Sequence, residues 1–214
     1  MAGAQGLREP GMEKFTRLAA SACPLPAENI DTDQILPARF LKLPRKGEHG
    51  KVLFRDLRFD ATDRERPDFP LNRPCWRDAK IIVSGRNFGG GSSREAAVYA
   101  LYDYGIRCVI APSFGDIFSQ NATKNGLLAA VLSEAEASAL VSALTREPTL
   151  TVTVDLVSQS IVCGDLQCQF TIDPARRTRL LNGWDDFDVT YSRREQIAEF
   201  KAAYQSARPW ATPS

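Results

Sequence analysis

A glycine-rich stretch between an apolar run and an amphipathic segment restricts the possible folds of this chain more than any other feature. Residues 85–95 read Gly-Arg-Asn-Phe-Gly-Gly-Gly-Ser-Ser-Arg-Glu and follow the apolar run Ile81-Ile82-Val83. The pattern predicts a strand, a turn and a helix over Ser92–Tyr104. The first N–H groups of a helix lack intrahelical partners, and the helix dipole favours negative charge there. With two serines and an arginine at this point, the stretch predicts a receptor for a small, multiply charged acid.

Three familiar glycine-loop motifs do not fit this stretch. A phosphate-binding loop requires lysine where Gly91 stands, and a dinucleotide fingerprint lacks its third glycine. The nucleophile elbow of hydrolases requires glycine at the position of Arg94. Serine–histidine hydrolysis is poorly supported as well, because the single histidine of the sequence, His49, lies in a separate loop.

The serines also allow a purely structural interpretation. Ser92-Ser93-Arg94-Glu95 has the spacing of a capping box, in which Ser92 caps the helix and Glu95 bonds back to its N–H group. Arg94 fits this interpretation less well. A cation in the first helical turn opposes the dipole unless Glu95 or a ligand compensates. On spacing alone, the structural and functional interpretations both stay open.

Length and charge bound the class of protein. A chain of 214 residues predicts one domain, and 27 basic against 26 acidic residues do not suggest a nucleic-acid partner. No apolar run reaches membrane-spanning length and no signal sequence opens the chain, so the cytoplasm is the expected location. We interpret residues 1–12 as a flexible leader, 13–208 as the domain and 209–214 as a tail. Five scattered cysteines predict neither a disulfide framework nor a metal site on this chain.

Regular alternation of strands and helices is predicted from Asp78 onward. The predicted strands are Ile81–Ser84, Cys108–Ala111 and Leu127–Leu132, followed by a hairpin of Thr149–Val157 and Ser160–Ile172. The predicted helices are Ser92–Tyr104, Phe114–Asn125, Ser133 to about Thr145, and residues 174–183 and 192–206. This order predicts an α/β domain with a mixed sheet and flanking helices.

Two irregular stretches precede this alternation. Asn29–Gln34 contains two aspartates and a threonine, which favour an Asx-type turn over a cation site because the glycine and glutamate of an EF-hand are missing. Residues 44–80 are dense in proline and charge, with isolated aromatic residues. We interpret this long stretch as a functional loop or lid rather than core.

Several separated segments resemble one family. They are 29–41 (Asn-Ile-Asp-Thr-Asp-Gln-Ile-Leu-Pro-Ala-Arg-Phe-Leu), the loop at 87–95, 103–118, 124–128, 170–174 and 181–183. Together, in collinear order over about residues 13–208, they are similar to the small subunit of 3-isopropylmalate dehydratase. The resemblance implies a single swivel-type domain, like the fourth domain of aconitase with its β/β/α architecture, made as a separate chain.

The resemblance also implies the activity. Members of this family serve a hydro-lyase that isomerises 2-isopropylmalate and 3-isopropylmalate by dehydration and rehydration in leucine biosynthesis. A large subunit, in a heterodimer or heterotetramer, would carry a [4Fe–4S] cluster, and this chain would bind no cofactor itself. The substrate would be a small dicarboxylate, held in the complex with the large subunit.

Carried over to this sequence, the resemblance assigns Ser92 as the catalytic base. Arg94 would bind a substrate carboxylate, since its planar fork offers bidentate geometry. The substrate-binding positions implied by the resemblance are Gly91, Ser93, Arg94, Asp31, Thr32, Asp33, Phe40 and Leu41. The last two would lie near the variable side chain of the substrate.

The chain departs from the family pattern next to the serine–arginine core. Gly90, Ala96, Val98 and Tyr99 stand where the family usually has cysteine, histidine, proline and tryptophan. One interpretation is a paralogue acting on another alkylmalate or 2-hydroxy diacid, because a pocket that differs by one methylene discriminates by only about 1–3 kcal/mol. Two other hypotheses are a non-catalytic regulatory partner of the large subunit and a free-standing binder of small carboxylates.

Overall fold

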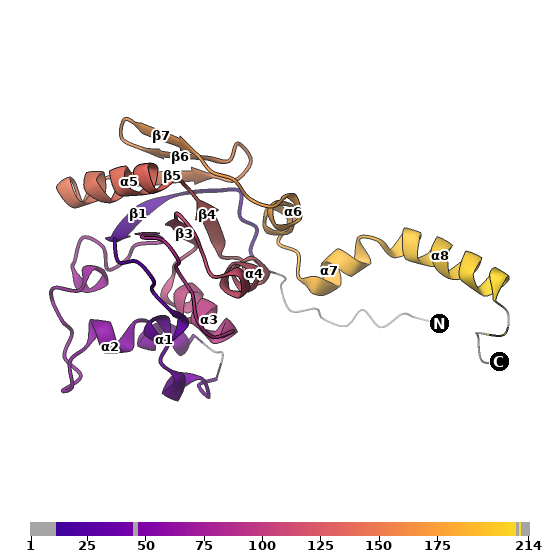
Figure 1. The fold of residues 1–214 in the computed structure, drawn as a ribbon, viewed down its shortest axis with the longest axis horizontal. Helices are drawn as coiled ribbons and strands as arrows, with labels where there is room; N and C mark the ends of the chain where they lie inside the picture. The colour runs from indigo at the N-terminus through magenta and orange to yellow at the C-terminus, as the bar shows by residue number, and fades with distance from the viewer. Residues whose placement is uncertain (1–11, 45–46, 209, 211–214) are drawn as a thin grey trace, which may run out of the picture.

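Figure 1 shows a mixed sheet with helices packed around it, described for residues 12–44, 47–208 and 210 in this computed structural model. The predicted leader, except Met12, and the predicted tail, except Trp210, lie outside the described residues. The predicted α/β class, with a mixed sheet and flanking helices, is confirmed. No described helix is both long and apolar enough to cross a membrane.

Seven strands form one sheet in the order β4-β3-β2-β1-β5-β6-β7. Their bounds are β1 (Arg17–Leu25), β2 (Ile81–Ser84), β3 (Cys108–Ala111), β4 (Leu128–Val131), β5 (Thr151–Asp155), β6 (Ser160–Cys163) and β7 (Leu166–Gln169). Strands β1 to β4 run parallel to one another, and β5 to β7 continue the sheet in antiparallel fashion from β1. The first strand therefore joins the two halves.

Helices connect the strands and cover the sheet. They are α1 (Thr32–Ile35), α2 (Arg55–Arg58), α3 (Glu95–Tyr104), α4 (Asp116–Lys124), α5 (Glu134–Arg146), α6 (Pro174–Asn182), α7 (Asp186–Tyr191) and α8 (Arg194–Ala207), with 3-10 turns η1 (Ala38–Phe40), η2 (His49–Val52) and η3 (Pro70–Asn72). Ser133 and Glu136 form the predicted capping box at the start of α5. Gly126, at φ +77°, follows α4 as predicted.

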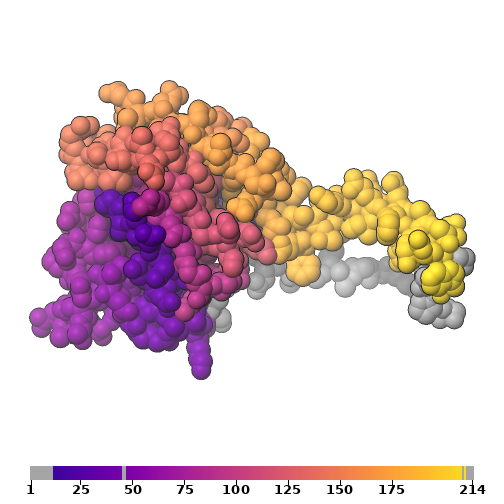
Figure 2. All heavy atoms as spheres, viewed as in Figure 1, coloured from indigo at the N-terminus to yellow at the C-terminus, as the bar shows by residue number. Residues whose placement is uncertain are grey.

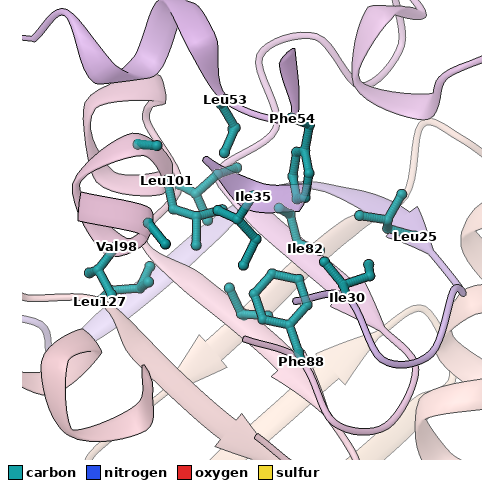
Figure 3. Packing of buried hydrophobic residues seen from close by; sticks show 14 of the residues in the cluster. Leu25, Ile30, Ile35, Leu53, Phe54, Ile82, Phe88, Val98, Leu101 and Leu127 are labelled. Carbon is teal, nitrogen blue, oxygen red and sulfur yellow. The ribbon is translucent and has the colours of Figure 1, made fainter. Parts of the chain in front are cut away.

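The parallel half confirms the predicted strands. All residues of β2 and β3 are buried, which explains why these strands read as uninterrupted apolar runs. Alternate residues of β2 serve two cores: Ile81 and Val83 pack in one cluster with α5, and Ile82 packs in the other with α3. Figure 3 shows Ile82 among Leu101, Phe88 and Phe54 in this second cluster.

The antiparallel half differs from the predicted hairpin. Residues 160–172 form two strands rather than one, because the chain turns at Gly164, whose φ is +55°. Cys163 and Leu166 pair across this turn. Near the carboxyl end, α7 was not predicted, and the predicted helix over 192–206 begins at Arg194.

The described part of residues 44–80 is irregular but belongs to the core. Leu53, Phe54 and Leu71 are fully buried there, so the expectation that this stretch lies outside the core is wrong. Two of its backbone carbonyls accept from the amide Nδ2 of Asn72: that of Arg58 (2.7 Å) and that of Arg66 (2.9 Å). The Asn72 side chain thus joins the short helical turns of this segment to its irregular part. A lid role for it stays a prediction.

Candidate active site

The turn after β2 brings the chain close to α4 and then to the start of α3. Gly89 and Gly91 have φ values of +72° and +90°, a backbone region that favours glycine. A Cβ atom at Gly89 would lie 2.2 Å from the ring of Phe118, so only glycine allows this approach to α4. The glycines therefore have a structural function, and they deliver Ser92, Ser93 and Arg94 to the N-terminus of α3.

The start of α3 differs from the predicted capping box. The helix begins at Glu95, three residues later than expected, and Arg94 occupies the N-cap position without a side-chain cap hydrogen bond. The carboxylate of Glu95 accepts a hydrogen bond from Nδ2 of Asn125 (2.8 Å) at the end of α4, a bond that the sequence did not suggest. The N–H of Ala97 donates to the carbonyl of Arg94 (3.1 Å), and the N-cap side chain itself makes no cap bond, so the N–H groups before Ala97 are the ones that could meet an anionic ligand.

The turn at residues 30–33 is bonded directly to this loop. The N–H of Gly89 donates to the carbonyl of Ile30 (2.7 Å), and the N–H of Thr32 donates to the carbonyl of Gly90 (3.0 Å). Thr32 is buried, and its hydroxyl donates to the carbonyl of Ser92 (3.0 Å). These bonds hold Ser92 outside the helix, which is the physical reason why the capping box does not form.

Asp31 and Asp33, on either side of Thr32, make different contacts. The Asp31 carboxylate accepts from the N–H of Gln34 (2.7 Å) and caps α1, so the predicted Asx-type turn is instead a helix N-cap, with its bond to the third residue on rather than the second. Asp33 forms an ion pair with Arg94. The Asp33 carboxylate is thus the anion that compensates the Arg94 cation at the start of α3. Glu95 and a ligand were the two compensating anions expected from the sequence.

The ion pair leaves hydrogen-bond donors of Arg94 available for a ligand. The Arg94 side chain is 18% exposed and the Asp33 side chain 53% exposed, so the pair lies at the surface with the guanidinium as its more buried member. A guanidinium has five N–H donors, more than one carboxylate uses, so a second carboxylate can bind beside or in place of Asp33. Ser92 and Ser93 are exposed next to it.

Seven of the predicted site residues therefore gather in one place. They are Asp31, Thr32 and Asp33 from the first segment, and Gly91, Ser92, Ser93 and Arg94 from the second. Phe40 and Leu41 follow α1 by a few residues. Phe40 packs against the core beneath the guanidinium of Arg39 (4.6 Å from its centroid), and Leu41 is 41% exposed. Their contact with a substrate stays a prediction.

Gly90 and Tyr99, two of the positions expected to differ from the family pattern, lie on either side of the serine–arginine residues in the sequence. A Cβ at Gly90 would come within 3.1 Å of the amide oxygen of Asn87, whose Nδ2 donates to Asn29 (2.9 Å). Tyr99 lies on α3 with its ring edge-on to His49, at 5.8 Å between centroids. Both positions contact residues outside the serine–arginine group: Gly90 is next to Asn87, and Tyr99 is next to His49.

The described residues provide no metal site, since no three His, Cys, Asp or Glu side chains among them converge on one point. The five cysteines are free thiols, and four of them are buried. Burial raises the pKa of Cys23 and Cys108 far above that of an ordinary thiol, which disfavours the thiolate that a metal requires. The residues present therefore do not fit an iron–sulfur cluster.

Comparisons with known proteins show the family of this chain. The family model for the aconitase C-terminal domain matches residues 12–135. The 3-isopropylmalate dehydratase small subunit of Rhodospirillum centenum is 49% identical over 94% of this chain and 99% of its own length, and that of Dinoroseobacter shibae is 48% identical over 93% and 100%. A solved structure, 3-isopropylmalate dehydratase from Methanocaldococcus jannaschii, is 26% identical with a TM-score of 0.61 and covers 87% of this chain and 99% of its own.

Proposed function

This chain belongs to the aconitase C-terminal domain family, among the 3-isopropylmalate dehydratase small subunits, and on that basis we propose that it is the small subunit of such a hydro-lyase. The reaction interconverts 2-isopropylmalate and 3-isopropylmalate by loss and return of water, in leucine biosynthesis in the cytoplasm. The chain acts only with a large subunit, in a heterodimer or heterotetramer. The similarity to these small subunits extends over nearly the full length of both chains. It does not favour activity on another alkylmalate or a regulatory role.

The observation that carries this proposal is the junction of residues 30–33 with the loop at 89–94. It presents an arginine, two exposed serines and an uncapped helix N-terminus on one surface. We assign Arg94 to one substrate carboxylate, with Ser93 and the N–H group of Gly91 in support. Ser92 then faces the carbon next to that carboxylate, as the resemblance implies.

Ser92 takes the proton from this carbon while the hydroxyl leaves the neighbouring carbon and a double bond forms between them. Return of water in the opposite orientation gives the other isomer. Serine is a weak base, so its alkoxide needs stabilisation, which the positive end of α3 and the Arg94 guanidinium supply. When the cluster is bound on the large subunit, it provides the Lewis acid that assists departure of the hydroxyl.

The three residues of the first segment have separate roles in this proposal. Asp31 caps α1 and fixes the turn, and Thr32 holds the Ser92 backbone through its hydroxyl. Asp33 orients the Arg94 guanidinium until the substrate carboxylate arrives. Phe40 and Leu41 are assigned to the variable side chain of the substrate, on the resemblance alone.

The test is turnover of 3-isopropylmalate by this chain with its large subunit, reconstituted without oxygen. Ser92→Ala is expected to lower kcat by roughly 100- to 10,000-fold, the range for loss of a general base. Arg94→Lys keeps the charge but loses the fork, so a loss of about 10- to 100-fold is expected. The control is Arg86→Lys, because Arg86 lies in the same turn but is exposed and pairs with Glu28.

Equal turnover in Arg94→Lys and Arg86→Lys would disprove the carboxylate role. The wild-type complex, loaded with its cluster, could turn over another alkylmalate but not 3-isopropylmalate. The proposed substrate would then be wrong and the proposed reaction class would stand. A stable complex in which Ser92→Ala and the wild-type chain have the same rate would instead support a regulatory partner.

A further inference from the structure

The last two helices stand away from the sheet. Figures 1 and 2 show α7 and α8 extending from the body of the molecule beyond α6. We call residues 186–208 the C-terminal arm. Its root is held by ion pairs of Asp186 with Arg179 of α6 and with Lys124 of α4 (3.5 Å). Among the described residues, none of those in α7 or α8 is buried.

The arm has a continuous apolar face. Phe187, Tyr191 and Ile197 line one open groove across the junction of α7 and α8. Phe200 and Tyr204 continue it, with ring centroids 5.9 Å apart. The spacings of three and four residues within α8 place Ile197, Phe200 and Tyr204 on one side of that helix. Phe187 and Phe200 are 77% and 69% exposed.

The rest of the described surface has no comparable patch. The large exposed hydrophobic residues of the body are aliphatic and lie in separate elements; they are Leu41, Leu57, Ile117, Val131, Val157 and Val162. Scattered aliphatic residues of this kind are normal on a protein surface, whereas a contiguous aromatic face marks an interaction site. Tyrosine, phenylalanine and tryptophan are also the residues enriched where proteins bind each other.

A covering partner would stabilise the helices of the arm. A helix of 14 residues is marginal in water when it stands alone, and no residue of α8 is fully buried. Packing of its aromatic face against a second protein would provide the missing stabilisation. The partner surface must therefore be apolar and groove-like, able to accept residues at helical spacing.

The identity of the partner follows from what the arm shares with other proteins. The match to the Rhodospirillum centenum small subunit covers 201 of the 214 residues, and the residues left over are fewer than those of the arm. Part of the arm is thus common to small subunits, whose activity we have proposed to depend on a large subunit. We propose that the aromatic face of the C-terminal arm is a docking surface for the large subunit.

This inference rests on the proposed function, so its test keeps the two apart. The wild-type chain and the double variant Phe200→Ala/Tyr204→Ala are titrated into the cluster-loaded large subunit under anaerobic conditions, and Kd is measured by sedimentation. Alanine preserves helix propensity, and the altered residues lie outside the proposed site. The control is Glu195→Gln/Ser206→Ala, which changes exposed residues on the other side of α8.

The aromatic variant is expected to bind at least about 100-fold more weakly, as loss of two central aromatic side chains predicts. The control is expected to bind within about threefold of the wild-type chain, as surface changes outside an interface do. At saturating small subunit, the aromatic variant should recover the wild-type kcat, because the arm does not touch the substrate.

Unchanged affinity of the aromatic variant would overturn the docking proposal. A second outcome would also overturn it. If the variant kept its affinity for the large subunit but lost self-association when the small chain was sedimented alone, the aromatic face would bind a second copy of this chain. A tight wild-type complex without turnover, weakened by the aromatic variant, would leave docking supported and the proposed reaction disproved.

Discussion

The loop at 89–94 and the C-terminal arm are both exposed, yet they are held in opposite ways. Buried anchors fix the loop: Thr32 bonds it to α1, and Phe88, just before it, is fully buried against α4. The arm has a fixed root and an unburied aromatic face. The loop exposes polar groups in fixed positions, whereas the arm exposes an apolar surface that the described chain does not bury.

The difference suggests how to interpret exposed residues in a chain of this kind. Exposed polar groups cost little in water, so rigid support for them indicates that their geometry serves a ligand. Exposed aromatic groups are unfavourable in water, so their persistence indicates a partner that buries them. Substitutions in the loop should therefore change kcat, and substitutions in the arm should change affinity.

The largest expected effect comes from a comparison of two phenylalanines, one beside the loop and one in the arm. Phe88→Ala removes a fully buried ring beside the loop and is expected to lower the free energy of unfolding by about 3–5 kcal/mol. Phe200→Ala removes an exposed ring from the arm and should change it by less than about 0.5 kcal/mol in the free chain. Urea unfolding of the chain without its partner measures both. A cost of several kcal/mol for Phe200→Ala would mean that the arm already packs within the free chain.

A smaller effect tests the anchor of the loop. Thr32→Val removes the hydroxyl that donates to Ser92, which should cost about 1 kcal/mol of stability and about tenfold in kcat through misplacement of Ser92. Thr123→Val is the matched control, since Thr123 is also buried and donates to the Ser119 carbonyl within α4. It should cost similar stability and leave kcat unchanged. Equal kcat values for the two variants would show that Thr32 supports the fold only.

The same contrast explains which elements the sequence could predict. Ser92 and Glu95 have the same spacing as Ser133 and Glu136, yet only the second pair forms a capping box. At α5 Ser133 and Glu136 bond to each other, through their side chains and backbone N–H groups. At α3 a threonine far away in sequence takes the Ser92 carbonyl and Asn125 bonds Glu95. Local spacing predicts local bonds, and it fails where a site is assembled from distant segments.

The other errors have related causes. Strand β1 was not predicted, because Ala, Ser and Cys residues give Arg17–Leu25 no clear alternation; it is a strand because it has partners on both sides. The described part of residues 44–80 is joined by buried contacts between Arg58 and Asn72, which no local sequence pattern predicts. By contrast, β2 and β3 were predicted to the residue, since buried parallel strands are recognisable from their own apolar runs.

The smallest predicted effect concerns the root of the arm. The Arg179 guanidinium donates to the Asp186 carboxylate and, with Lys124, lowers the pKa of that group in the folded chain. A carboxylate with a lowered pKa contributes stability above its unfolded pKa of about 3.9 and loses that contribution as pH falls through its folded pKa. Asp186→Asn should therefore increase hydrogen exchange in α7 at pH 7, and the increase should become smaller as the pH is lowered below about 3.9 toward pH 3. The pair is exposed, so the change is expected to stay below about 1 kcal/mol.

Asp56→Asn provides the matched control for this measurement. Asp56 also pairs with an arginine, Arg39, which lowers its pKa in the same direction, but the pair lies far from the arm along the chain. Its loss should leave exchange in α7 unchanged at both pH values. If Asp186→Asn also left α7 unchanged at pH 7, the root of the arm would be held by contacts other than this ion pair. Docking would then depend on the aromatic face alone and not on the ion pair at the root of the arm.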